Sequence, residues 1–325
     1  MGGIEKFNMK IGVIGGGVMG TNHARILNDM GLLGCIVEPD SGSFDRLSQR
    51  FNNVPILRSV DDDTDSCAYV VATPSSTHFS IAEKLILQKK HLLIEKPVCT
   101  NTSDAIRLKN IIENNIVSVG LIERFNPILQ YTKSWVLKNK VNVINTYRLS
   151  PQPSRIQDVG VIMDLGIHDI DAQIYLSGGN VKSVYASSIA PNKGNPEHYG
   201  KIIMNFDNGV VGTAEVSWMH SYKVRKIDLV SSSMCASADY LNQTFCEQNS
   251  ESSGEYLNGF QLQVSSKKSE VNLARLEPLR LELESFVECI RGNKRPMVTI
   301  DDGIESLRVV EAALLSIETK SEIKL

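Results

Sequence analysis

Three glycines near the start of the chain constrain its fold more than any other feature. The apolar segment KIGVIG, residues 10–15, leads into GGVMG, so that Gly15, Gly17 and Gly20 form the pattern G-x-G-x-x-G between a predicted strand and a predicted helix. In this setting the first glycine permits a tight turn, the second lets the backbone approach a diphosphate, and the third lets helix and strand pack closely. The pattern therefore predicts a βα unit that binds a dinucleotide.

The helix after this turn would bind the diphosphate with its first backbone N–H groups, where the helix dipole favours negative charge. Val18 and Met19 begin that helix and are therefore expected in the cofactor site. A dinucleotide also needs an acid at the end of the second strand to accept its ribose hydroxyls. Glu38 has that position, and the run Ser41-Gly42-Ser43 supplies no cation for a 2′-phosphate. NAD is therefore expected rather than NADP, unless Arg46 folds back toward the ribose.

Apolar segments alternate with helical patterns through the first 122 residues. LLGCIVE, CAYVVAT, HLLIEK and IVSVGLI have the patterns of strands, and SIAEKLILQKK and SDAIRLKNIIENN those of helices between the later strands. Strands that alternate with helices predict a parallel, doubly wound sheet. We therefore expect an NAD-binding Rossmann domain at residues 1–122.

Composition limits the partners of the chain. At 325 residues it exceeds the usual size of one hydrophobic core, so a second domain is expected at residues 123–325. A formal net charge of -3 gives no general attraction to nucleic acid or to anionic lipid. No apolar run reaches the roughly 20 residues that cross a bilayer, and no signal peptide is evident, so a cytoplasmic protein is expected. The six cysteines lack a C-x-x-C pair, which predicts reduced thiols and no metal site.

Strand patterns dominate the second half of the chain. They occur in VNVINTYRL, VKSVYASSI, YGKIIMNF, GVVGTAEVSW and VRKIDLV, with the hairpin signal DNG between the third and the fourth. Within GVVGTAEVSW small and apolar residues alternate with Thr213, Glu215 and Ser217. One face of the predicted sheet would therefore cover helices, and the other would meet a second subunit. PLRLELESFVECI and DGIESLRVVEAALLSIE are predicted helices near the end of the chain.

Two predicted strands of the first domain end in residues that can contact a cofactor, because ligands of such sheets bind beyond the carboxyl ends of the strands. ATPSSTH places Thr73, Pro74 and His78 after one strand. LLIEKP places Glu95 and Lys96 at the end of the next, with Lys96 directed to where the nicotinamide would lie. The alternatives are a histidine without a task at a helix N-terminus and a solvated strand end.

The order of G-x-G-x-x-G, TPSSTH and EKP resembles the family of glucose-fructose oxidoreductase and inositol dehydrogenase, called Gfo/Idh/MocA. GVIMDLGIHDID in the second half is similar to the D-x-x-x-H catalytic segment of that family, at Asp164 and His168. The resemblance covers nearly the whole chain. It implies a Rossmann domain followed by an α/β domain with a large, mostly antiparallel sheet, which often forms the interface of a homodimer or homotetramer.

Spacing alone would make His168 a buried helical histidine, satisfied by Asp164 four residues earlier. The resemblance instead implies oxidation of an alcohol by hydride transfer to nicotinamide. His168 would take the hydroxyl proton. Lys96 would hydrogen-bond the same oxygen and stabilise its developing charge. Asp164 would orient the substrate or the imidazole, and Glu95 would orient Lys96 or the cofactor amide.

Residues just after the first domain bear on the substrate. GLIERFNPILQ contains Arg124 and Asn126, which are both expected to contact it. Asn126 is also a predicted N-cap, with Pro127 in the first helical position. A structural ion pair is the alternative role of Arg124.

Four further segments are similar to the branch of the family that oxidises UDP-N-acetylglucosamine at C3, which implies a nucleotide-sugar substrate. They are ERFNP, SWMHSYKVRKI, DYLNQ and EPLRLELESFVECI. Residues 231–256 are rich in Ser, Asn and Cys where glycine-rich turns would be expected, so a myo-inositol or aldose dehydrogenase is an alternative. A non-catalytic dinucleotide-binding regulator is another, although it would not require Lys96, Asp164 and His168 together.

Overall fold

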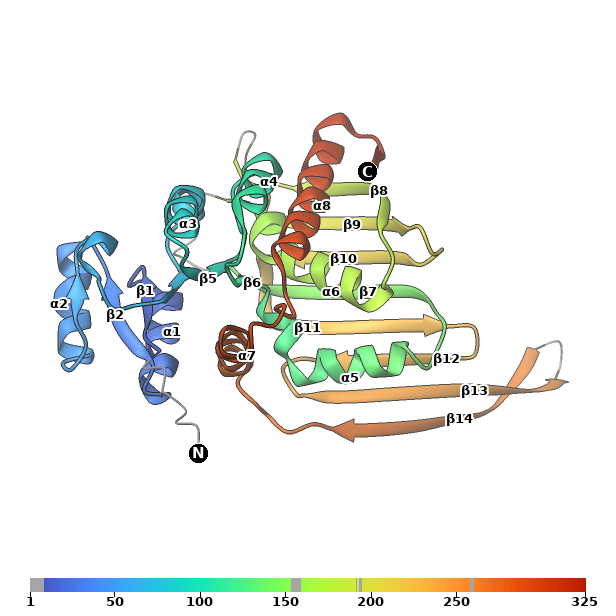
Figure 1. The fold of residues 1–325 in the computed structure, drawn as a ribbon. Helices are drawn as coiled ribbons and strands as arrows, with labels where there is room; N and C mark the ends of the chain where they lie inside the picture. The colour runs from blue at the N-terminus through green and yellow to red at the C-terminus, as the bar shows by residue number, and fades with distance from the viewer. Residues whose placement is uncertain (1–8, 153–158, 191, 193–194, 258–259) are drawn as a thin grey trace. The chain divides into compact units, whose positions relative to one another are not determined.

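The chain forms two compact units. The computed structural model describes residues 9–152, 159–190, 192, 195–257 and 260–325. The first unit comprises Met1–Leu121 and Leu279–Glu305, and the second comprises Ile122–Pro278 and Ser306–Leu325. Residues 279–305 belong to the first unit, although the sequence patterns predict them within the second domain. Figure 1 follows the chain through the elements of both units.

The first unit contains a six-stranded sheet with the strand order β3-β2-β1-β4-β5-β6. All neighbouring pairs are parallel. The order reverses between β1 and β4, where the carboxyl ends of the strands receive ligands in doubly wound sheets. The predicted Rossmann sheet is confirmed. The strands are β1 (Ile11–Ile14), β2 (Leu33–Val37), β3 (Ile56–Leu57), β4 (Ala68–Val71), β5 (His91–Glu95) and β6 (Val117–Gly120).

Helices connect these strands. They are α1 (Val18–Asp29), α2 (Ser41–Arg50), α3 (His78–Leu87) and α4 (Thr102–Ile111), with short 3-10 turns η1 (Val60–Asp62) and η2 (Ser75–Thr77). Two N-caps explain where helices begin: Asp40 accepts a hydrogen bond from Ser43 N, and Asn101 accepts one from Asp104 N.

The helix α7 (Pro278–Gly292) joins the first unit from the far end of the sequence. Arg280 Nη2 lies 3.2 Å from Asp29 Oδ2 of α1. After α7, Ser118 Oγ of β6 donates a hydrogen bond of 3.0 Å to the carbonyl of Val298. The helix α8 (Ile300–Thr319) then begins in the first unit and ends in the second.

The second unit is built on a nine-stranded sheet with the order β14-β13-β12-β11-β7-β10-β9-β8-β15. Among the described strand pairs, β7 with β10 is parallel and the others are antiparallel. The predicted large, mostly antiparallel sheet is confirmed. The strands are β7 (Val141–Pro151), β8 (Val181–Ile189), β9 (Tyr199–Phe206), β10 (Val211–Ser217), β11 (Met219–Ser231), β12 (Met234–Asp239), β13 (Thr244–Leu257), β14 (Phe260–Asn272) and β15 (Ile323–Lys324).

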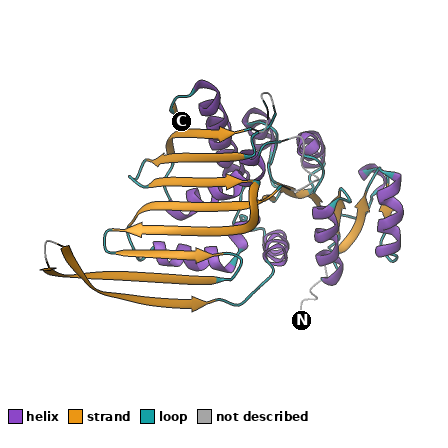
Figure 2. Cartoon of the chain, turned by 180° about the vertical axis from the view of Figure 1, so that it is seen from behind, coloured by secondary structure: helices purple, strands orange, loops and turns teal. Residues whose placement is uncertain are grey.

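Helices cover one face of this sheet. A 3-10 turn η3 (Ile122–Phe125), α5 (Pro127–Val136), a π-helical turn η4 (Ile162–Gly166) and α6 (Ile167–Ser177) precede the C-terminal part of α8. The helices α5, α6 and α8 lie on the same side of the strands, and the opposite side of the sheet is open in Figure 2. In β10, Ala214 and Val216 are fully buried, whereas Thr213 and Glu215 are half-buried, as the alternation predicts. At the end of the strand the alternation fails, because Ser217, predicted on the same face as Thr213 and Glu215, is also fully buried. Cover of the open face by a second subunit stays a prediction.

The described residues contain neither a membrane-spanning helix nor a cluster of metal ligands. Over that part of the chain, no helix has the length and apolar character that a bilayer span requires. The same part contains no group of His, Cys, Asp and Glu side chains arranged to hold a metal ion.

Candidate active site

The glycine turn between β1 and α1 has the geometry of a diphosphate cradle. Gly15 has a φ of 101°, and a Cβ atom there would lie 2.5 Å from the carbonyl oxygen of Ala72. A Cβ at Gly20 would collide with the carbonyl of Gly15, so helix and turn pack closely at this point. A Cβ at Gly17 would meet nothing within 4 Å. Open space at Gly17 is what the approach of a diphosphate to the backbone requires.

The N-terminus of α1 fits an anionic ligand. Gly17 is its N-cap and provides no side-chain hydrogen bond, and the first turn contains no acid. Val18 is 61% exposed, and Met19 is half-buried. The first N–H groups of a 12-residue helix therefore face the predicted cofactor position without a competing carboxylate.

Glu38 lies at the end of β2 and contacts the glycine turn. Its Oε2 accepts a hydrogen bond of 2.7 Å from Gly16 N, and its Oε1 accepts one of 2.9 Å from Asp40 N. Arg46 does fold back, because its Nη2 donates a hydrogen bond of 2.8 Å to the carbonyl of Gly16. Arg58 Nη1 donates to the carbonyl of Pro39 at 2.8 Å. The end of β2 thus presents one acid and two guanidinium groups.

His78 joins the two loops that follow β4 and β5. Its Nδ1 lies 2.8 Å from the carbonyl oxygen of Pro97, and its Nε2 lies 2.9 Å from that of Thr73. The side chain is 1% exposed. Burial lowers the pKa of His78, although both carbonyls and the charge of Glu95 oppose this effect. His78 therefore positions the loops around the predicted cofactor site, while Pro74 is exposed at its surface.

Glu95, at the end of β5, is engaged at both carboxylate oxygens. Oε1 lies 2.7 Å from Nε2 of His23, and Oε2 accepts a hydrogen bond of 3.2 Å from the backbone N of Lys96. Burial favours the neutral acid, but the hydrogen bond and charge of His23, with the charge of Lys96, lower the pKa of Glu95 below its ordinary value. His23 is a partner of Glu95 that the sequence motifs do not predict. The available signal was its position on the buried face of α1, beside Ala24, Ile26 and Leu27.

Asp164 and His168 lie on consecutive elements of the second unit. Asp164 is in the π-helical turn η4, and His168 is the second residue of α6. Both are half-buried. α6 ends as predicted, because Gly178 takes a left-handed conformation with a φ of 67°.

A buried charge cluster adjoins His168 in the sequence. Arg148 Nε donates to Asp169 Oδ2 at 3.0 Å, and Arg148 Nη1 donates to Glu123 Oε1 at 2.7 Å. Burial and the charge of Arg148 lower the pKa of Arg225, on the neighbouring strand β11, to about 10. The charges of Glu123, Asp169 and Asp164 oppose that shift. Of these cluster residues, only Asp164 was predicted to be functional. The residues are far apart in the sequence and so form no local motif, and the pairing of β7 with β11 brings Arg148 and Arg225 together.

Arg124 and Asn126 are both buried and have protein partners. Arg124 pairs with Asp171 through Nε and Nη2, which is the ion-pair alternative. Asn126 is the N-cap of α5, with Pro127 in the first turn, so the predicted cap is confirmed. Its Oδ1 also accepts a hydrogen bond of 2.9 Å from Gln243 Nε2. Contact of either residue with substrate stays a prediction.

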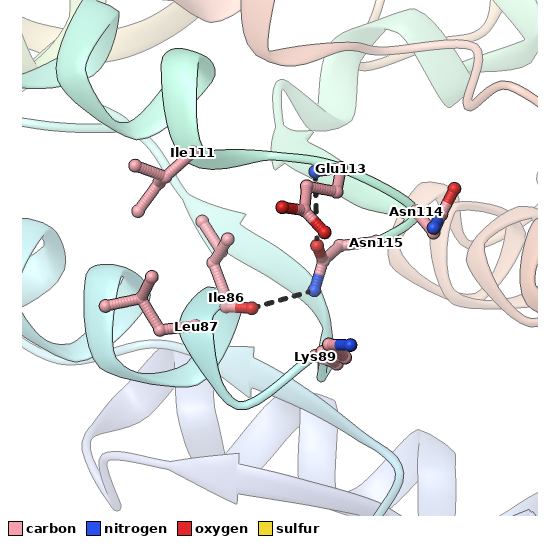
Figure 3. A pocket seen from close by; sticks show the side chains of 7 residues that line it. All are labelled: Ile86, Leu87, Lys89, Ile111, Glu113, Asn114 and Asn115. Atoms are coloured by element: carbon pink, nitrogen blue, oxygen red, sulfur yellow. Dashed lines mark hydrogen bonds between the residues drawn. The ribbon is translucent and has the colours of Figure 1, made fainter.

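A small cavity of about 120 Å³ lies at the amino ends of strands in the first sheet (Figure 3). Asn115 Nδ2 donates to the carbonyl of Ile86 at its wall. The wall lies just before β5 and β6 begin, so the cavity is at the amino ends of these strands, away from the glycine turn. It is therefore not part of the candidate active site. The lining residues are Ile86, Leu87, Lys89, Ile111, Glu113, Asn114 and Asn115.

Comparison with protein families agrees with this geometry. The Gfo/Idh/MocA model of oxidoreductases with an NAD-binding Rossmann fold matches residues 9–121. The model of the C-terminal α/β domain of the same family matches residues 136–325. This chain belongs to the Gfo/Idh/MocA oxidoreductase family. The resemblance and the prediction of an NAD(P)-dependent dehydrogenase are confirmed.

Several relatives match over nearly their whole length. UDP-N-acetylglucosamine 3-dehydrogenase of Acidithiobacillus ferrooxidans is 28% identical over 319 residues, covering 94% of this chain and 96% of the relative. Myo-inositol 2-dehydrogenase of Thermotoga maritima is 25% identical over 348 residues, covering 98% of each chain. A solved structure of the Acidithiobacillus enzyme has a TM-score of 0.87 and 25% identity, covering 96% of this chain and 98% of that one. The fold is shared with GenD2, solved with NAD, at a TM-score of 0.82 and 20% identity, covering 98% of this chain and 96% of that one.

Proposed function

We propose that this protein oxidises a hydroxyl of a nucleotide sugar to a ketone, with UDP-N-acetylglucosamine oxidised at C3 as the leading reaction and NAD as the acceptor. The observation that carries the proposal is the combination of the glycine cradle with Lys96 after β5 and the Asp164–His168 segment in the second unit. The match to a UDP-N-acetylglucosamine 3-dehydrogenase across almost the whole chain supports this substrate.

The chemistry assigns a separate task to each catalytic side chain. NAD, when bound, supplies the acceptor for the hydride that leaves the carbinol carbon. His168 takes the hydroxyl proton, so the C–O bond gains double-bond character as the C–H bond breaks. Lys96 donates a hydrogen bond to the same oxygen and stabilises its negative charge. Asp164 orients the imidazole or the sugar.

The cofactor-binding residues follow from the first unit. Gly15, Gly17 and Gly20 with Val18 and Met19 would hold the diphosphate. Glu38 would accept the ribose hydroxyls and repel a 2′-phosphate, which favours NAD over NADP. Arg46, which folds back onto the Gly16 carbonyl, would oppose this preference by attracting such a phosphate. The loop residues Thr73 and Pro74, with Glu95 and Lys96, would border the nicotinamide half, and His78 would fix the loops that carry them.

The proposal also covers the setting of the enzyme. The open face of the nine-stranded sheet would pair with a second copy of the chain, giving a homodimer or a homotetramer. A cytoplasmic location is favoured by the cysteines, which are all free thiols.

Inositol dehydrogenase is the second candidate activity, because relatives with that function match the same length of chain. The two candidate activities are distinguished by following the formation of reduced cofactor, NADH from NAD or NADPH from NADP. The substrates are UDP-N-acetylglucosamine, UDP-glucose, myo-inositol and glucose. Reduction of NAD with UDP-N-acetylglucosamine and not with myo-inositol is the expected result. Turnover of myo-inositol alone would replace the proposal by the second candidate. NAD binding without turnover of any of these compounds would favour a regulator.

A further inference from the structure

Glu282 is a buried carboxyl group that the proposed chemistry does not use. It lies on α7, and it is 1% exposed. Both of its carboxylate oxygens are buried, and neither has a hydrogen-bond partner within the part of the chain that the structure describes. A buried acid without partners is costly, and a charged one much more so. Its retention inside the Rossmann unit therefore calls for an explanation.

The charge next to Glu282 belongs to Glu95. Burial and the negative charge of Glu95 together raise the pKa of Glu282 well above its ordinary value. Three other titratable groups interact with Glu95: His23 of α1, which is bonded to it, Lys96, which follows it in the chain, and His78 of α3. Nδ1 of His23 is also buried without a hydrogen-bond partner among the described residues. Unsatisfied polar atoms from α1 and α7 thus flank one residue of the EKP turn.

We propose that Glu282 is a positioning residue for the catalytic turn, and that it packs against Glu95 as an uncharged acid and holds the Glu95–His23 pair in one arrangement. A carboxyl group that is buried without hydrogen-bond partners is costly to ionise, and the negative charge of Glu95 adds to that cost, so Glu282 keeps its proton. A neutral carboxyl group also has an O–H donor, and ionised Glu95 is an acceptor. The residue acts through Glu95 on the backbone of the Glu95–Lys96 turn, which borders the predicted nicotinamide position, because Glu95 Oε2 accepts a hydrogen bond from the backbone N of Lys96.

Glu282 is carried by α7, which packs with the Rossmann unit although it comes late in the sequence. Arg280 of α7 forms a solvent-exposed ion pair with Asp29 of α1, the helix that also carries His23. One helix from residues 278–292 therefore supports both the N-terminal helix of the glycine turn and the end of β5. The inference rests on the proposed function only in taking the Glu95–Lys96 turn as part of the site.

The protonation state is tested by comparing wild type with Glu282→Gln, an amide of the same shape. If the native acid is neutral, the folded protein binds more protons than the unfolded chain above the ordinary pKa of glutamate. The stability of the wild type then falls through this group as pH rises, and that of the variant does not. The melting temperature of Glu282→Gln relative to wild type should therefore rise from about pH 5 to about pH 8. A constant difference over that range would overturn the proposal.

Positioning is tested by calorimetric binding of NAD, which needs no sugar substrate and so is separate from failure of the proposed function. Glu282→Leu keeps the bulk and removes the polar group, and it should raise the Kd for NAD about tenfold. Glu282→Gln should keep the Kd within about twofold of wild type, since the amide still has a donor. The control is Glu288→Gln, on the exposed face of α7, which should change neither measurement. Unchanged NAD affinity in a folded Glu282→Leu protein would refute the positioning role. If Glu282→Leu does not fold, Glu282→Gln alone decides. A Kd for NAD about tenfold above that of wild type in Glu282→Gln would then refute the positioning role.

Discussion

Arg124 and Asp171 form a bidentate ion pair in the interior of the second unit. Nη2 of the arginine lies 2.7 Å from Oδ1 of the aspartate, and Nε lies 3.0 Å from the same atom. The two residues are only 4% and 1% exposed. Because each charge is buried away from water, removal of one partner leaves the other buried without this ion pair.

Arg124→Met is therefore expected to reduce the free energy of unfolding by about 3–5 kcal/mol. Arg124→Met with Asp171→Leu should recover much of that loss, because both charges are then gone. Urea denaturation of the two single variants and the double variant measures the coupling. Equal stability of Arg124→Met and wild type would show that the pair contributes little, and a large change in KM alone would favour the substrate-binding role.

Gly17 and Gly20 offer a matched pair of substitutions in the cofactor turn. Gly17→Ala should fold normally and bind NAD more weakly, because its methyl group would enter the open space that the diphosphate needs. Gly20→Ala should lower the melting temperature, because its methyl group would meet the Gly15 carbonyl. Thermal unfolding and NAD calorimetry on both proteins separate the two effects. Loss of stability in Gly17→Ala with normal NAD affinity would contradict this division.

Glu38 and the guanidinium groups near it set the preference between NAD and NADP. Glu38→Ser should lower the ratio of kcat/KM for NAD to that for NADP by roughly ten- to a hundredfold, since a hydrogen bond to a charged group contributes about 1.5–3 kcal/mol. Arg46 would then meet the 2′-phosphate without the opposing carboxylate. Glu38→Ser combined with Arg46→Ala is the control, and it should lose the gain with NADP. An unchanged ratio in the single variant would remove Glu38 as the selector.

The parts of the fold that follow local patterns were predictable from the sequence. The glycine turn, the cap at Asn126 and the stop at Gly178 each depend on a few neighbouring residues, and the structure contains all three. The sheets followed from periodicity in the same way. Each local feature has a physical cause that does not depend on the rest of the chain.

The contacts that hold the site depend on pairing across long sequence distances, which a local pattern does not specify. His23 of α1 meets Glu95 at the end of β5, 72 residues later in the chain, and Arg148 meets Asp169 because α6 packs on β7. The packing of α7 on α1 is of the same kind. A buried charged residue looks in the sequence like a surface residue, and only its partner distinguishes the two.

Lys96 tests the division between binding and chemistry. Lys96→Ala should abolish turnover, because no side chain would stabilise the developing alkoxide, while the Kd for NAD changes little. Lys90→Ala, just before the amino end of β5, is the control. Lys90 Nζ donates a hydrogen bond to the Ser66 carbonyl, away from the candidate active site. Turnover is followed by NADH formation and binding by calorimetry. Turnover of Lys96→Ala at the wild-type rate would refute the catalytic assignment.

The most direct test of the proposed reaction is the transfer of deuterium from UDP-N-acetylglucosamine labelled at C3. Purified protein is incubated with the labelled sugar and NAD, and the reduced cofactor is analysed by mass spectrometry. The account predicts that the NADH formed carries the deuterium and that the sugar product is a 3-ketone without it. Unlabelled NADH would contradict the account. So would the absence of NADH with the labelled sugar when a parallel incubation of the protein with myo-inositol and NAD does form NADH.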